Sequence, residues 1–439
     1  MSVRDLLVAA IVLASLPVAL FRPWIGILVW SWISYMSPHR LTWGFAYTMP
    51  VAFMASLATV GGMILTRAPI SIPRDRTVNF LILLWVVFFL SSVFDPLYPI
   101  DAWDQLIKVS KILLATFLTI ILCQKRERLR LLLWVIALSI GFFAVKGGIF
   151  AFLTRGQLTV FGPSGSFIEG NNELGLAMNM NVPILVYLRR DERNPWLKRL
   201  LLVMFGLSVV AILTTYSRGA AVGLVMVLGL LFLKARSKLA PLFLLVIAVP
   251  IVLAVLPARL MERYHTIQTY QEDASAMGRI RAWQLAMRLA ADRPLLGGGF
   301  RPFTPETYAR YMPERPELMY EGADAHNIFF QVLAEHGVTG LVLYVGLVVV
   351  TLADLRRVVR RTKSRPELRW LHHYGLMMEG SVVAYVVTGF FLSLSYFDLY
   401  FHFIAVAIIL KELLRVAEKE AALAPALAPE PVAAVAAAT

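Results

Sequence analysis

Apolar stretches long enough to cross a lipid bilayer recur from one end of this sequence to the other. A membrane-spanning helix needs about 20 mostly apolar residues. The chain is 59% hydrophobic and only 16% charged, whereas soluble domains carry about 25% charged residues. Pro17 and Pro23 interrupt the first two apolar runs, which we count as one hairpin-like unit. We therefore predict an all-α, polytopic transmembrane helix bundle of about 12 helices. The apolar runs begin near residues 6, 24, 48, 77, 105, 129, 171, 199, 219, 240, 326, 374 and 398.

Several functions and partners are disfavoured by composition. The net charge of +14 comes from Lys and Arg in short loops rather than on a basic, aromatic-rich face, so we expect no nucleic acid partner. Cys123 is the single cysteine, which excludes an intramolecular disulfide and a Cys-based zinc cluster. The run at residues 6–21 lacks a small-residue cleavage site, and we interpret it as a retained helix rather than a removed signal peptide.

The distribution of basic residues predicts the orientation. Cytoplasmic loops of membrane proteins are enriched in Lys and Arg, and alternate connections in this chain carry such clusters. These connections are residues 67–76, 125–130, 189–199, 234–238 and 356–369. The intervening connections are poor in Lys and Arg and should face outward, together with one long loop that contains helix-like stretches such as 275–291. We predict transmembrane helices in residues 1–255, a periplasmic helical loop at 256–325, further transmembrane helices at 326–414 and a disordered cytoplasmic tail at 415–439.

Cationic side chains collect at the predicted outer side. An ionisable group at membrane depth costs about 2.5–3.5 kcal/mol on insertion scales, so each one is a functional hypothesis. For Lys108 and Lys111 the alternative is that the side chain only extends to the interface. Arg218 lies in a tight Tyr-Ser-Arg-Gly turn between two apolar runs, which favours a function. The full set of cations is Lys108, Lys111, Lys146, Arg155, Arg218, Arg279 and Arg281.

Helix direction also favours an anion site. Helices that begin near Asn171, Ser217 and His326 would run inward, so their N-termini would point outward. The free N–H groups and positive dipole end of such a terminus attract phosphate. Asn171 and Ser217 are residue types that often cap helices.

His326 begins a stretch with a regular pattern. On a helix, His326, Phe330, Leu333, Gly337 and Gly340 would form one stripe, whose glycines allow close helix packing. A histidine near neutral pKa is suited to act as a general base for a hydroxyl nucleophile. The alternative is an interfacial histidine that only caps the helix. Because the sequence has neither a His-Glu-x-x-His motif nor a close Asp-x-Asp pair, we expect no metal site. We also expect no cofactor.

Three motifs resemble the O-antigen ligase and polymerase family of bacterial membrane glycosyltransferases, in particular ligases of the WaaL type. The first is His326-Asn327, nine residues, Gly337, two residues and Gly340. The second is Gly278-Arg279 with Trp283, Pro294 and Gly297–Gly299. The third is Ser217-Arg218-Gly219. The amino-terminal third looks most like glycosylation ligases associated with exopolysaccharide systems.

The resemblance implies a GT-C-like bundle in the bacterial inner membrane with its active site facing the periplasm. A glycan on undecaprenyl pyrophosphate would be transferred, with inversion, to a sugar hydroxyl of lipid A–core. His326 would act as general base, while Arg218 and Arg279 would bind the pyrophosphate. Arg281 diverges from Arg279 on a helix, so we favour Arg279. The remaining predicted substrate contacts are Arg155, Lys111, Lys146, Asn171, Arg281 and Asn327.

Other functions are compatible with the same motifs. An O-antigen polymerase and an oligosaccharyltransferase acting on protein share the donor chemistry and differ in the acceptor. A transporter of lipid-linked glycan would instead be expected to show internal repeats and charges near the bilayer midplane. The sequence shows no clear repeat, and its cations gather at one side.

Overall fold

The computed structural model describes residues 2–94, 96–235, 274–314 and 324–423. The described residues are 78% helical and contain no strand, which confirms the predicted all-α class. The helices are α1 (Val3–Phe21), α2 (Pro23–Met36), α3 (Val51–Leu65), α4 (Arg76–Val93), α5 (Pro99–Leu122), α6 (Arg126–Leu153), α7 (Asn171–Asp191), α8 (Pro195–Thr214), α9 (Arg218–Leu233), α12 (Ala274–Asp292), α13 (Pro305–Tyr311), α15 (Ile328–Thr362), α16 (Arg369–Gly389) and α17 (Asp398–Leu423). Short 3-10 turns occupy Pro38–Leu41, Phe45–Thr48 and Pro366–Leu368.

The helices match most of the predicted apolar runs. Among the described residues, α1, α4, α5, α6, α8 and α15 are long and apolar enough to cross a membrane, and α3 and α9 are shorter apolar helices. The predicted run at 240–257 and the first part of the long loop, 256–273, lie outside the described residues. Helix α17 continues to Leu423, so helix replaces the first residues of the tail expected from residue 415.

The described residues of the basic connections meet at one end of the bundle, which we call the basic end. Contacts join these connections to one another. Gln124 Nε2 donates to Ser71 O at 2.8 Å, and Arg130 binds Glu192 at 2.8 Å. Arg126 lies over the Trp370 ring at 4.7 Å, while Arg356 and Lys234 both bind Glu379. The alternation read from the sequence therefore brings these connections to one end.

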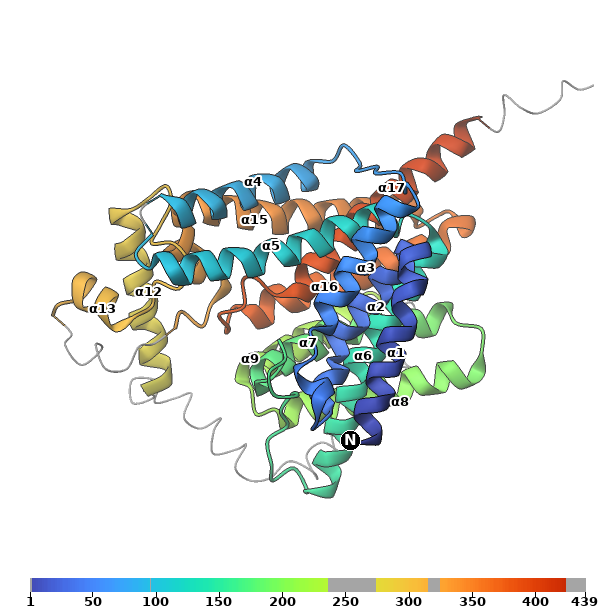
Figure 1. The fold of residues 1–439 in the computed structure, drawn as a ribbon, viewed down its shortest axis with the longest axis horizontal. Coiled ribbons are helices and arrows are strands. Elements are labelled where there is room, and N and C mark those ends of the chain that lie inside the picture. The colour runs from blue at the N-terminus through green and yellow to red at the C-terminus, as the bar shows by residue number, and fades with distance from the viewer. Residues whose placement is uncertain (1, 95, 236–273, 315–323, 424–439) are drawn as a thin grey trace, which may run out of the picture.

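The other connections meet at the opposite end, which we call the far end. Asp5 near the start of α1 accepts a hydrogen bond from Gly44 N–H at 3.1 Å, in the α2–α3 connection. Val160 N–H in the α6–α7 connection donates to Thr214 O at 3.1 Å. Leu97 N–H, between α4 and α5, donates to Gly298 O at 2.8 Å. In Figure 1, α12 lies across the far end of α15, against which it packs.

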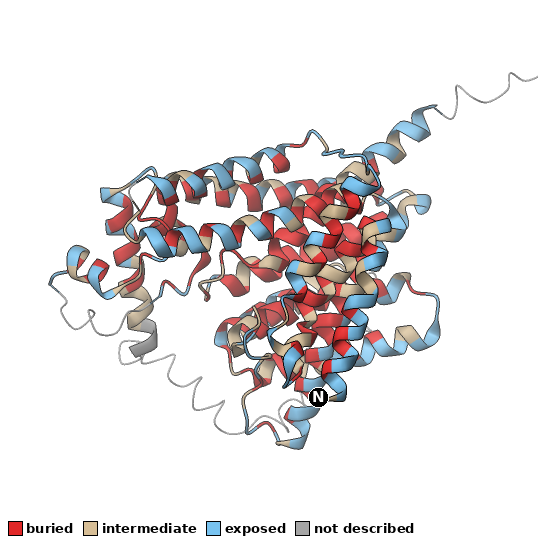
Figure 2. Cartoon of the chain, in the orientation of Figure 1, coloured by how far each residue is buried: buried red, intermediate tan, exposed pale blue. Residues whose placement is uncertain are grey.

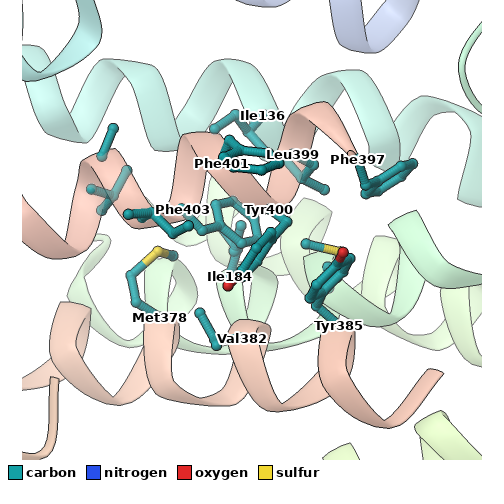
Figure 3. Close-up of a cluster of buried hydrophobic side chains, with 14 of the residues drawn as sticks. Ile136, Ile184, Met378, Val382, Tyr385, Phe397, Leu399, Tyr400, Phe401 and Phe403 are labelled. Atoms are coloured by element: carbon teal, nitrogen blue, oxygen red, sulfur yellow. The ribbon is translucent and has the colours of Figure 1, made fainter. Parts of the chain in front are cut away.

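Buried residues are concentrated on α7, α16 and α17 (Figure 2), and side chains of these helices pack together around α16 (Figure 3). Tyr385 of α16 stacks on Tyr400 of α17 with ring centroids 4.1 Å apart and planes inclined by 10°. The Tyr385 hydroxyl lies 2.5 Å from that of Tyr344 on α15. Because buried tyrosine hydroxyls need partners, this pairing satisfies Tyr385 and Tyr344, whereas the Tyr400 hydroxyl has no hydrogen-bond partner among the described residues. The outward faces of α1, α4 and α5 keep exposed apolar residues, as lipid-facing surfaces require.

Helix α15 is broken at Gly337. Its backbone has φ 67° and ψ −166°, a conformation that other residues adopt only with strain. The break frees carbonyl groups that a helix would have bonded, and the glycine-rich turn after α12 supplies their donors. Three hydrogen bonds close the break: Gly298 N–H to Ala334 O at 2.9 Å, Gly299 N–H to Glu335 O at 3.0 Å, and Val338 N–H to Pro294 O at 2.8 Å. Two sequence motifs about 40 residues apart thus form one structural unit.

We expect Gly337→Ala to lower the apparent unfolding temperature of the detergent-solubilised protein. A Cβ at this position would meet the Pro294 carbonyl, and the backbone strain alone costs about 1–3 kcal/mol. The matched control is Gly229→Ala on α9, where a Cβ meets open space. There, better helix propensity should leave the unfolding temperature unchanged or slightly higher. Equal unfolding temperatures for the two variants would contradict the proposed backbone requirement.

Candidate functional site

His326 stands just before α15 rather than on it. Its backbone is left-handed, with φ 42°, and its N–H donates to Ser393 Oγ at 2.8 Å. Asn327 caps the helix, since its Oδ1 accepts from Phe329 N–H at 2.8 Å and from Phe330 N–H at 3.2 Å. The predicted helical stripe from His326 to Gly340 is therefore wrong at two points. His326 precedes the helix, and Gly337 interrupts it.

Helix α12 brings Arg279 to His326. The Trp283 ring stacks on Phe330 with centroids 4.9 Å apart and planes inclined by 6°, and its Nε1–H donates to Ala325 O at 2.8 Å. Arg279 lies one turn before Trp283 on the same helix face. This arrangement directs Arg279 toward His326. The neighbouring Arg281 lies on a different part of α12 and is half-buried.

The surroundings of His326 favour its neutral form. Atoms packed around part of the ring lower the pKa of His326 through desolvation, and the positive charge of Arg279 lowers it further. Asp324 and Glu173 act in the opposite direction, and their net effect on this pKa is smaller. Because the pKa lies below its ordinary value of 6.5, the imidazole is neutral at pH 7 and free to accept a proton.

Arg218 begins α9 beside the start of α7. Ser217 caps α9, with its Oγ accepting from Ala220 N–H at 3.2 Å, as the sequence predicts. Asn171 is not a cap: it is the first residue of α7 after Gly170, and its Nδ2 donates to Thr215 O at 2.8 Å. The two helix N-termini are therefore held together at the far end, with the exposed Arg218 at their edge.

The α16–α17 connection, residues 390–397, joins the Arg218 region to the His326 region. The backbone of Gly219 packs against Phe391, and Phe390 lies 6.1 Å from the Trp283 ring of α12. Ser393 in the same connection holds the N–H of His326. The three predicted catalytic residues therefore border one region of the far end. They are His326, Arg218 and Arg279.

Arg155 and Lys146 lie near the α8–α9 turn that precedes Arg218. Arg155 is exposed in a left-handed conformation with φ 50°, and the carbonyl of the next residue, Gly156, accepts a hydrogen bond from Tyr216 of that turn. Lys146 is exposed on α6, and the adjacent Gly147 packs against Val160 of the α6–α7 connection. Both residues thus adjoin the Arg218 turn.

Lys111 occupies a different surface. It lines an apolar groove of about 320 Å³ between α4 and α5, together with Trp85 and Trp103. The described structure therefore does not bring Lys111 into the His326 region. Lys108, one turn earlier on α5, lies near Asp398 at the start of α17.

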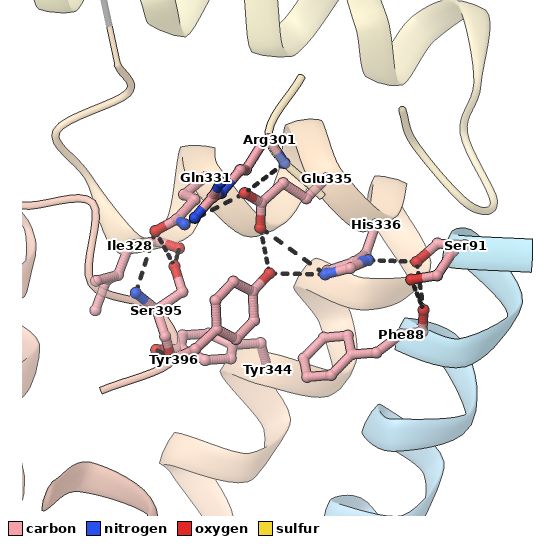
Figure 4. Close-up of polar contacts among 11 residues, drawn as sticks. Phe88, Ser91, Arg301, Ile328, Gln331, Glu335, His336, Tyr344, Ser395 and Tyr396 are labelled. Atoms are coloured by element: carbon pink, nitrogen blue, oxygen red, sulfur yellow. Dashed lines mark hydrogen bonds and ion pairs between the residues drawn. The ribbon is translucent and has the colours of Figure 1, made fainter. Parts of the chain in front are cut away.

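A buried chain of hydrogen bonds lies next to the break in α15 (Figure 4). The Tyr396 hydroxyl donates to Glu335 Oε2 and lies 2.7 Å from His336 Nε2. His336 Nδ1 lies 2.6 Å from Ser91 Oγ on α4. Since Tyr396 gives its only proton to Glu335, we infer that His336 Nε2 is the donor in its contact with the Tyr396 hydroxyl. Glu335 and His336 are almost completely buried, at 2% and 0% exposed.

The same carboxylate is tied to the segment that holds His326. Glu335 Oε1 accepts from Arg301 N–H and Gln331 Nε2, each at 3.3 Å. Gln331 Oε1 in turn accepts from Ser395 N–H at 3.1 Å. Ser395 Oγ lies 2.8 Å from Ile328 O, in the first turn of α15. Glu335 therefore links the glycine-rich turn, the start of α15 and the α16–α17 connection.

Sequence reasoning missed this chain of buried hydrogen bonds and the acidic neighbours of His326, Asp324 and Glu173. Glu335 and His336 are adjacent ionisable residues in an apolar run, which is a signal of function or of a specific buried network. Ser393 and Tyr396 gave no such signal, since their roles depend on tertiary contacts. In the described ranges, no three His, Cys, Asp or Glu side chains converge as metal ligands would.

Comparison with protein families divides the chain into two matched segments. The family described as O-antigen ligase matches residues 203–345, and a family of unknown function, DUF5935, matches residues 3–193. No curated protein matches the chain. The segment matched by the O-antigen ligase family contains Arg218, Arg279 and His326, as well as the glycine-rich turn and the break in α15.

We expect Asp324→Asn to lower the pKa of His326 further. Removing this negative charge destabilises the imidazolium, so protonation requires a lower pH. NMR titration of histidine-labelled protein measures the shift, with the His326 signal assigned by its loss in His326→Gln. Asp104→Asn, an exposed substitution on α5, is the control and should leave the His326 titration unchanged. A shift to higher pH in Asp324→Asn would contradict the expected effect.

Proposed function

Because the O-antigen ligase domain at residues 203–345 makes this chain a member of the O-antigen ligase family, we propose that it transfers a glycan from undecaprenyl pyrophosphate to a sugar hydroxyl of lipid A–core. The family and the helical fold together identify a membrane glycosyltransferase of the ligase and polymerase kind. The observation that carries the proposal is the pairing of His326, whose pKa is lowered, with Arg279 at the far end.

The chemistry needs one base and a site for a leaving anion. The acceptor oxygen attacks the anomeric carbon of the donor, and the bond from that carbon to the pyrophosphate oxygen breaks. The hydroxyl proton passes to His326 Nδ1 or Nε2, and undecaprenyl pyrophosphate departs with the bonding electrons. A single displacement inverts the anomeric centre.

Arg279 and Arg218 have the chemistry to hold the leaving group. Their guanidinium groups provide fixed positive charge and paired N–H donors for phosphate oxygens. The N-terminus of α9 adds free N–H groups and the positive end of a helix dipole beside Arg218. Charge that grows on the pyrophosphate is therefore stabilised more in the transition state than in the bound donor.

The other predicted contacts surround this centre to different extents. Arg155 and Lys146, beside the Arg218 turn, are proposed to bind donor phosphate or sugar. Arg281, Asn171 and Asn327 remain predicted substrate contacts, although both asparagines also hold backbone groups. The groove beside Lys111 suits a lipid chain with an anionic head, so we retain Lys111 as a contact of a lipid substrate.

We propose that the protein lies in the bacterial inner membrane with its basic end in the cytoplasm. The positive-inside rule supports this orientation, because the described residues of the five Lys- and Arg-rich connections lie at that end. His326 would then face the periplasm, where a lipid-linked pyrophosphate provides an activated donor without a nucleotide sugar.

We expect His326→Ala and Arg279→Ala to abolish measurable transfer while the protein still inserts and folds. Loss of a general base lowers kcat by about 10²- to 10⁴-fold, and loss of one electrostatic donor by about 10²- to 10³-fold. The assay uses purified protein, defined lipid-linked donor and lipid A–core, with and without a chelator. Arg288→Ala is the control, since Arg288 lies on the same helix and binds Glu314 at 2.6 Å. Wild-type turnover in either test variant would remove that residue from the mechanism.

The acceptor is tested by the products that accumulate when the gene is deleted. Unligated lipid-linked polymer together with bare core supports the ligase. Loss of polymer supports a polymerase of the same family, and loss of glycan from protein supports an oligosaccharyltransferase. Glycan flipping in liposomes without any transfer in detergent would instead support a transporter.

We also propose that Glu335 positions His326 through the α16–α17 connection. Glu335→Gln alters the hydrogen bonds to Tyr396 and Gln331, and a displacement of about 1 Å at a reacting group costs up to about 100-fold in rate. We therefore expect a lower kcat per folded molecule, with the donor KM unchanged. The control is Glu379→Gln, which removes a buried carboxylate at the basic end. It should lower stability without changing kcat, and the same pattern in Glu335→Gln would refute the positioning role.

A further inference from the structure

The basic end contains a second polar site, far along the bundle from His326. A pocket of about 410 Å³ opens where α6 begins, α7 ends and α16 begins. Polar and charged groups dominate its lining, in contrast to the groove beside Lys111. The lining residues are Arg126, Arg130, Asp191, Glu192, Arg193, Pro366, Glu367, Arg369, Trp370 and Tyr374.

The arginines of this pocket are only partly neutralised. Arg130 binds Glu192 at 2.8 Å, while Arg126 lies over the Trp370 ring at 4.7 Å. Arg193 and Arg369 form no ion pair with any residue that the structure describes. Both are exposed and line the same pocket. The pocket therefore presents guanidinium groups that remain available to an anion.

Two further features of the pocket fit a ligand that carries both a negative charge and a hydrogen-bond donor. Helix α6 starts at Arg126, which lines the pocket, and no side chain caps the free N–H groups of its first turn. Asp191 binds His373 through Oδ1 at 2.5 Å, but its buried Oδ2 has no partner among the described residues. A ligand with a phosphate and a hydroxyl group would satisfy both sets of atoms.

Arginine and tryptophan pairs place this pocket at a membrane surface. Besides Arg126 over Trp370, Arg128 lies over Trp24 at 5.3 Å and Arg199 over Trp196 at 5.0 Å, all at the basic end. Tryptophans concentrate where lipid head groups meet the hydrocarbon core. A lipid head group is therefore a nearer source of phosphate than the bulk solution.

We propose that this pocket binds the head group of an anionic glycerophospholipid such as phosphatidylglycerol. The phosphate lies among Arg193, Arg369 and Arg126, and a glycerol hydroxyl donates to Asp191 Oδ2. Basic pockets between transmembrane helices bind anionic head groups in this way. The site is independent of glycan transfer, since it lies at the end of the bundle opposite His326.

Delipidated full-length protein in detergent tests this proposal by native mass spectrometry and thermal shift. Added phosphatidylglycerol should bind to the delipidated protein and raise its unfolding temperature more than added phosphatidylethanolamine or phosphatidylcholine does. In the double variant Arg193→Ala/Arg369→Ala, its apparent affinity should fall at least about tenfold, as expected when two charge-assisted contacts are lost. The control Arg357→Ala/Arg360→Ala removes two exposed arginines of the same end that do not line the pocket, and should change affinity less than about twofold.

Three outcomes would overturn the proposal. Equal loss of affinity in both double variants would assign binding to the overall charge of the basic end. Equal stabilisation by all three lipids would exclude an anionic head-group site. Stabilisation by glycerol 3-phosphate or inorganic phosphate as strong as that by the lipid would assign the pocket to a soluble anion.

Discussion

The backbone hydrogen bonds between the glycine-rich turn and the broken helix α15 hold the far end together. A helix interrupted within a membrane protein exposes carbonyl and N–H groups that lipid cannot satisfy, and each one is costly unless protein supplies a partner. Here the turn at residues 294–299 supplies those partners. The same contact fixes α12 over α15, and with it the position of Arg279 relative to His326.

Side-chain hydrogen bonds connect the break in α15 both to the interior and to the surface of the bundle. Toward the interior, Glu335, Tyr396 and His336 connect the break to α4, so the buried polar groups are bonded to each other rather than left unpaired. Toward the surface, Gln331 and Ser395 connect it to the segment that holds His326. The polar side chains of the interior are thus bonded to one another, and the backbone at His326 is held by Ser393.

Much of this arrangement was accessible from sequence because it depends on local pattern. Apolar run length predicted the helices, and the spacing of Arg-rich connections predicted that they meet at one end. Helix geometry predicted that Arg279 and Arg281 diverge, and Arg279 is the one whose charge acts on His326. Tertiary contacts were not accessible. A glycine at 337 is compatible with a close helix contact or with a break, and only the turn from 294 decides between them. Asn171 has the chemistry of a cap, but the carbonyl of Thr215 takes its side chain instead.

The segment matched by the O-antigen ligase family ends at residue 345, yet the N–H of His326 is held by Ser393, and Tyr396 completes the buried chain. Asn171, which fixes the neighbouring turn, precedes the segment as well. The family boundary is therefore a boundary of sequence similarity and not of an autonomous module. Transplanting residues 203–345 into another membrane scaffold would transfer Arg218, Arg279 and His326 without Ser393, Tyr396 and Asn171, and so without the contacts that these three residues make here.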